Sequence, residues 1–143
     1  SYPERIYISR SDASRRRVVN ETPLLRLLQR HDFAVVKLEE WAFREQVELF
    51  RQAKIVVSTH GAGLANLVFC GPHARVLEFH SPHWVNACYF DLSQQVSLDY
   101  HYLFGQDVLV PDSITGKERY DIAINVEQVE EWLEAFLIPG SRQ

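Results

Sequence analysis

One stretch near the middle of the sequence constrains the fold more than any other. A β-branched run at residues 55–57 leads through Ser58, Thr59 and His60 into a turn with glycine at positions 61 and 63, and an apolar, helix-prone run follows. This order predicts a buried strand, a tight loop and a helix. The first turn of a helix has backbone N–H groups without partners and a partial positive charge, so such a loop can bind an anion.

The two glycines of this loop would let a phosphate approach the backbone. A side chain at Gly61 or Gly63 would block the ligand or oppose a positive φ. We therefore expect the segment Gly61, Ala62, Gly63 and Leu64 to contact a phosphate. The pattern is neither the full dinucleotide fingerprint nor a Gly-Lys-Ser phosphate loop. A turn that only connects a strand to a helix explains the glycines equally well.

Strands and helices alternate along the rest of the chain. Predicted strands lie at residues 5–10, 33–38, 54–57, 75–79 and 97–104, and predicted helices at 22–31, 42–53, 64–70, 83–96 and 126–137. The first helix begins either at Thr22 and Pro23, or at Val18 with a kink at Pro23. Asn125 is expected to cap the last helix. Residues 105–120 are expected to form a polar loop.

Five alternations of strand and helix predict one α/β domain over residues 1–143. Its sheet is expected to be doubly wound, mainly parallel and Rossmann-like, with helices on both faces. The chain has 143 residues, 46% of them apolar, which is sufficient for the core of one domain. It contains no methionine, even at position 1, so we interpret it as a domain excised from a longer chain.

Polar residues gather where the predicted strands end. In a doubly wound sheet, ligands bind at the carboxyl ends of the strands, where the strand order reverses. The candidate site residues at these ends are Ser9, Arg10, Glu39, Ser58, His60 and Glu78.

Arg10 is the preferred phosphate ligand, because a guanidinium can bind a phosphate through two parallel hydrogen bonds. Together with three further arginines at positions 15–17, Arg10 makes up the only basic cluster in the sequence. These three arginines either add to the phosphate site or form a solvated loop.

Glu78 and Glu39 are candidates for the nucleoside end of a ligand. A carboxylate only accepts hydrogen bonds, so it suits the two hydroxyls of a ribose and repels a phosphate. The alternative for Glu78 is an ion pair with a lysine or arginine at the end of the strand. Glu39 is expected at the same place on the second strand.

His60 could donate a hydrogen bond to a phosphate or to a leaving-group oxygen near neutral pH. It is the one catalytic candidate, and a structural hydrogen bond is its alternative role. The other histidines lack metal-ligand spacing, so we expect no metal site. Ser58 and His60 lack the Gly-x-Ser-x-Gly elbow of a nucleophile, so nucleophilic catalysis is not expected.

Composition excludes several classes of partner. A net charge of −4 argues against nucleic acid and membrane surfaces, and no apolar run is long enough to span a bilayer. Cys70 and Cys88 form neither a disulfide framework nor a zinc site, so the cellular compartment stays open.

The order and spacing of these residues resemble glycosyltransferase family 61 over residues 5–104. The segments that carry the resemblance are 5–10, 15–17 with Asn20 and Glu21, Leu38 and Glu39, Glu45 and Gln46, Leu49 and Phe50, Ala53, 60–66, and Val76 to Glu78.

The resemblance implies an inverting transferase of GT-B-like architecture, with two Rossmann-like halves. This chain would be the half that binds a nucleotide sugar, a UDP-sugar, as donor substrate rather than as cofactor. A glycan or protein acceptor and the amino-terminal half of the same protein would be its partners, and that half is a candidate location for the catalytic base. The rival interpretations are a non-catalytic module that binds a nucleotide or sugar, and a nucleotide-dependent enzyme of other chemistry.

Overall fold

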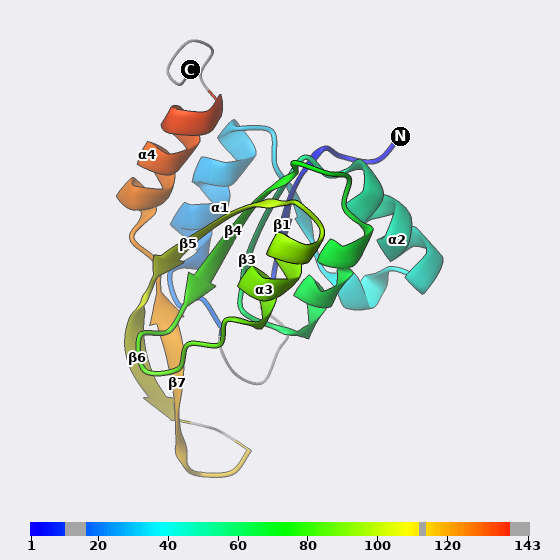
Figure 1. Ribbon diagram of the computed structural model, residues 1–143. Coiled ribbons are helices and arrows are strands. Elements are labelled where there is room, and N and C mark those ends of the chain that lie inside the picture. The colour runs from blue at the N-terminus through cyan, green and yellow to red at the C-terminus, as the bar shows by residue number, and fades with distance from the viewer. Residues whose placement is uncertain (11–16, 112–113, 138–143) are drawn as a thin grey trace.

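The computed structural model describes residues 1–10, 17–111 and 114–137 of the chain. Five strands form a parallel sheet in the order β2-β1-β3-β4-β5 (Figure 1). The strands are β1 (Arg5–Ile8), β2 (Ala34–Val36), β3 (Ile55–Thr59), β4 (Arg75–His80) and β5 (Asp99–Phe104). All five predicted strands are present, with ends that differ by at most two residues, and the expected α/β class with a mainly parallel sheet is confirmed.

Helices cover both faces of the sheet, as the right-handed crossovers of parallel strands require. Helices α1 (Glu21–Arg30) and α4 (Val126–Leu137) lie on one face, and α2 (Phe43–Gln52), the 3-10 helix η2 (Ala62–Phe69) and α3 (Cys88–Gln95) lie on the other (Figure 1). Alternate strand residues supply the two cores. Ile6 and Val56 pack under α2 and η2, whereas Tyr7 and Val57 pack under α1 and α4.

The strand order reverses between β1 and β3. From β1 the chain moves outward to β2, returns past β1 to β3, and then continues outward to β4 and β5. The carboxyl ends of β1 and β3 are therefore the switch point at which ligands bind in open α/β sheets.

Residues 105–120 do not form the polar loop expected from Gly105, Pro111 and Gly116. They contribute instead to an antiparallel hairpin of β6 (Gln106–Pro111) and β7 (Glu118–Ala123). The glycines and proline lie at the ends of the strands and in the turn, where they are compatible with a hairpin. Ile122 at the end of β7 is buried in the core under α1 and α4.

The first helix begins at Glu21, so the predicted start with Thr22 as cap and Pro23 as first helical residue is wrong, and so is the alternative start at Val18. Asn20 precedes it and exchanges two hydrogen bonds, of 2.7 and 2.9 Å, with the backbone of Ile124. Pro23 is the third residue of the helix, where no intrahelical N–H bond is made and no kink is needed.

The last helix starts as predicted. The amide of Gln128 donates to Oδ1 of Asn125 at 3.2 Å, and this bond caps the N-terminus of α4. Helix α3 is shorter than the predicted 83–96 because Ser81 and Trp84 pair in a turn before it. None of the helices in the described part of the chain has the length and apolar character that crossing a membrane requires.

Candidate functional site

Arg10 and Gly61 meet at the switch point. Parallel pairing of Ile8 with Ser58 brings the end of β1 beside the end of β3, so the residues that follow each strand are neighbours. A Cβ atom on Gly61 would lie 3.1 Å from Cζ of Arg10 and closer still to its Nη1. The guanidinium of Arg10 therefore lies directly against the Cα of Gly61.

Glycine is needed at position 61 for space and not for an unusual backbone. The φ angle of Gly61 is 176°, an extended value that any residue adopts, so the expected positive φ is absent there. A Cβ on Gly63 would lie 2.7 Å from Cδ1 of Leu38, so Gly63 allows η2 to pack closely on the core. The two glycines thus have different neighbours, a cation in one case and a leucine in the other.

The loop after Gly61 is a 3-10 turn. The amide of Leu64 donates to the carbonyl of Gly61 at 3.0 Å, and its side chain is buried. The amide of Leu64, expected to contact a phosphate, is therefore engaged within the turn. Any phosphate contact falls to the backbone of Gly61, Ala62 and Gly63, which stays a prediction.

Both predicted serines bind protein groups. The hydroxyl of Ser9 donates to the carboxylate of Glu21 at 3.1 and 3.2 Å, and the hydroxyl of Tyr7 donates to the same group at 2.9 Å. The hydroxyl of Ser58 donates to the carbonyl of Thr59 at 2.8 Å and is buried. These bonds fix the ends of β1 and β3, and ligand contacts for the two serines stay predictions.

Glu39 is not at the end of a strand. Strand β2 ends at Val36, and Glu39 lies exposed in the short 3-10 helix η1 (Leu38–Glu40). The expectation that it shares the strand-end position of Glu78 is wrong, because the strand ends two residues earlier than the apolar run suggests. Of the predicted arginine cluster, Arg15 and Arg16 lie outside the described residues.

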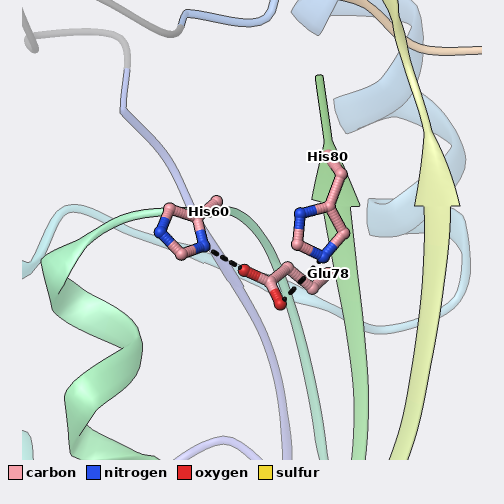
Figure 2. Close-up of side chains that lie close together, drawn as sticks. All are labelled: His60, Glu78 and His80. Carbon is pink, nitrogen blue, oxygen red and sulfur yellow. Dashed lines mark hydrogen bonds and ion pairs between the residues drawn. The ribbon is translucent and has the colours of Figure 1, made fainter. Parts of the chain in front are cut away.

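Glu78 is the centre of a buried polar network. Its side chain is 0% exposed, and it lies inside β4, two residues before the end of the strand. One carboxylate oxygen binds Nδ1 of His60 at 2.6 Å; the other accepts from the hydroxyl of Tyr100 at 2.5 Å and lies 3.2 Å from Nε2 of His80 (Figure 2). The carboxylate expected to bind a ribose thus has three protein partners.

The network favours the ionised form of Glu78. Burial by itself raises the pKa of this carboxyl group, but hydrogen bonds from His80, Tyr100 and His60 outweigh burial, so the pKa of Glu78 lies below its ordinary value. A carboxylate only accepts hydrogen bonds, so Nδ1 of His60 must donate. The other ring nitrogen of His60 points away from Glu78 (Figure 2).

Aromatic rings enclose His60. The ring centroids of Tyr89 and Trp84 lie 5.0 and 5.2 Å from that of His60. Trp84 is partly exposed, whereas His60 is buried. The imidazole is therefore shielded from bulk water, where its hydrogen bonds and charge are more effective than at an open surface.

His60, Glu78 and His80 are also residue types that bind divalent metals, and their ligand atoms lie within 4.8 Å of one another. The carboxylate lies between the two rings, with one oxygen toward each (Figure 2). Metal ligands surround a common point instead. The arrangement is that of a hydrogen-bond network.

The sequence interpretation missed His80, Tyr100 and Glu21. His80 lies two residues after Glu78, a spacing that places both side chains on one face of a strand, so this partner could have been found. Tyr100 comes from β5, where Val76 is its partner in the register, and Glu21 depends on the position of α1. These two contacts are set by the tertiary structure.

The chain is similar to known glycosyltransferases. A family model described as Glycosyltransferase 61 matches residues 1–77. The chain is 32% identical over 108 residues to the EGF domain-specific O-linked N-acetylglucosamine transferase of Drosophila melanogaster, covering 73% of this chain and 20% of that protein. It is 30% identical over 116 residues to the protein O-linked-mannose beta-1,4-N-acetylglucosaminyltransferase 2 of Bos taurus, covering 76% of this chain and 20% of that protein.

A plant relative matches a shorter segment. The chain is 36% identical over 58 residues to a beta-1,2-xylosyltransferase of Oryza sativa subsp. japonica, covering 41% of this chain and 11% of that protein. The chain thus spans a fifth or less of the length of these curated relatives.

Proposed function

The chain belongs to glycosyltransferase family 61, and we propose that it is the donor-binding half of an inverting transferase with GT-B-like architecture. Its donor is a nucleotide sugar, UDP-linked, and its acceptor is a hydroxyl group of a glycan or protein. The names of the relatives, which are N-acetylglucosamine and xylose transferases, support this class of reaction. The catalytic base and the acceptor site belong to the part of the protein outside this chain.

One observation carries the proposal: the guanidinium of Arg10 lies against Gly61 at the switch point of the sheet. A cation and the amides of a glycine turn at this place suit a diphosphate. Arg10 is half-buried, so its side chain is partly sheltered from water. Such a charge-assisted contact is worth about 1.5 to 3 kcal/mol.

The same groups stabilise the leaving group. In the transfer, an acceptor oxygen forms a bond to the anomeric carbon while the bond from that carbon to the diphosphate oxygen breaks, and a base takes the acceptor proton. Negative charge then grows on the departing UDP, where preorganised donors are most effective. Arg10 and the backbone of the glycine turn supply donors in this role.

Replacement of Arg10 by alanine in the full-length enzyme tests the proposal. We expect kcat to fall about 100-fold with a much smaller rise in the KM for the acceptor, since the lost donor acts on the transition state. Arg10→Lys should be intermediate, because an ammonium lacks the planar pair of donors. Arg51→Ala, which removes an exposed side chain of α2, is the matched control with unchanged kcat. An unchanged kcat in Arg10→Ala contradicts the role.

Nucleotide binding separates the proposal from its rivals. Calorimetry of the chain against UDP, GDP, CMP and NAD should show stabilisation by UDP alone. Stabilisation by UDP without transfer in the full-length protein would indicate a non-catalytic module that binds a nucleotide or sugar. Stabilisation by NAD would indicate a nucleotide-dependent enzyme of other chemistry.

A further inference from the structure

Hydrogen-bond counting around Glu78 fixes the proton positions of its partners. The carboxylate is fully buried, ionised and therefore acceptor-only, so each neighbour within bonding distance must donate. Tyr100 has one hydroxyl proton, and the 2.5 Å contact with Glu78 uses it. Burial and the adjacent carboxylate raise the pKa of Tyr100, so this proton is retained.

His80 must then donate from Nε2. This nitrogen lies 3.0 Å from the hydroxyl oxygen of Tyr100 and 3.2 Å from Oε1 of Glu78. Because the hydroxyl proton of Tyr100 is already engaged, Nε2 can only act as the donor to either oxygen. Glu78 is thus held from one side by His80 and Tyr100, while its other oxygen is left for His60.

We propose that Tyr100 and His80 are positioning residues of the donor site, which hold the carboxylate of Glu78 against His60. They fix His60 with its Nδ1–H toward Glu78, so that its Nε2 edge points away from the carboxylate. The inference rests on the proposed function for the identity of the ligand, but the proton positions do not depend on it. A carboxylate that orients an imidazole in this way recurs where histidine acts on a substrate.

The titratable groups in and around the network come from β4 and from the elements packed against it. They are His60 after β3, Glu78 and His80 on β4, Tyr100 and Tyr102 on β5, and Cys88 at the start of α3. Cys88 and Tyr102 are exposed, whereas His80, Tyr100 and His60 contact the carboxylate and dominate its environment.

The proton positions can be observed directly by nuclear magnetic resonance of the isotope-labelled, unliganded chain. Both cores of the sheet are built from residues of this chain. We expect Nδ1 of His60 and Nε2 of His80 to carry protons at neutral pH. In Tyr100→Phe, the pKa of the Glu78 carboxyl group should rise toward its ordinary value, because one hydrogen bond to the charged form is lost. An unprotonated Nδ1 on His60, or an unmoved pKa of Glu78, would overturn the inference.

Two substitutions at position 80, His80→Gln and His80→Leu, distinguish a positioning role of His80 from a packing role. Glutamine can present an N–H close to the place of Nε2 of His80, whereas leucine cannot. In the full-length enzyme, we expect His80→Leu to lower kcat about tenfold and His80→Gln to recover most of it. Tyr100→Phe should also move the acidic limb of kcat/KM for the donor to higher pH. Equal losses in His80→Leu and His80→Gln with no shift of that limb would overturn the inference.

Two controls keep this test distinct from that of the proposed function. A full-length protein that transfers no sugar would remove the proposed function, while the resonance measurements would still decide the proton positions. Zn²⁺ binding to the unliganded chain, lost in both Glu78→Gln and His80→Leu, would overturn the inference by assigning these side chains to a metal.

Discussion

The two sides of the carboxyl edge of the sheet use polar side chains in opposite ways. At the β1 and β3 side, the half-buried cation of Arg10 lies on a glycine backbone. At the β4 side, Glu78 is fully buried and its oxygens bind side chains of the protein. A polar residue at a strand end is therefore understood from its partners: Arg10 contacts the backbone of Gly61, whereas Glu78 binds the side chains of His60, His80 and Tyr100.

Glu78→Ala should show the largest effect and sharpen this contrast. It leaves the donors of His60, His80 and Tyr100 without their buried acceptor, so we expect the free energy of unfolding to fall by about 3 to 5 kcal/mol. Arg10→Ala should change it by about 1 kcal/mol or less. Urea unfolding of both variants measures the difference, and equal losses would remove the distinction between the two sides.

Gly61→Ala tests the Arg10 side of this edge without removing a charge. The new Cβ would displace the guanidinium of Arg10, so we expect the affinity for UDP to fall about tenfold, or about 1.4 kcal/mol. Gly71→Ala is the matched control, because its Cβ would have its nearest neighbour, the carbonyl of Arg51, at 4.0 Å. Calorimetric titration of both variants with UDP checks this, and similar affinities would show that Arg10 does not depend on the space at Gly61.

The smallest effect is the pH dependence of stability contributed by the buried side. The pKa of Glu78 is lowered in the folded chain, so its stabilising contribution is present above the ordinary value of 4.5 and is lost as pH falls through the folded value. Glu78→Gln should lack this part of the acid dependence. Urea unfolding between neutral and acidic pH measures the free energy of unfolding of the wild-type protein and of Glu78→Gln. The same pH dependence in both proteins would contradict the lowered pKa of Glu78.

Much of the fold could be predicted from the period of the apolar residues. Short β-branched runs separated by helical patterns identified the five parallel strands, and the polar residues after β1 and β3 predicted that Arg10 and Gly61 would be neighbours. The hairpin of β6 and β7 was missed because Gly105, Pro111 and Gly116 were interpreted as loop residues. Alternation in the residues between these turn residues is the signal that could have identified it.

The environment of Glu78 was less accessible to sequence reasoning. Glu78 was expected at the end of a strand predicted over residues 75–79, as a ribose ligand or an ion-pair partner, but β4 extends one residue further, to His80, and Glu78 lies inside the sheet. Burial of an acid depends on which donors neighbouring strands bring to it, and the contact with Tyr100 joins residues 22 positions apart. Local patterns do not determine such pairings.

The bonds between Asn20 and Ile124 join positions 104 residues apart in the chain, and the amide of Arg17 adds a bond to the carboxylate of Asp121 over the same separation. During translation, the first helix therefore emerges long before the segment that holds its beginning and covers its apolar face. The nascent domain must wait for its final third before one of its two cores can close. A prematurely terminated polypeptide would expose Leu24, Leu27 and Leu28, the surface that cellular quality control recognises.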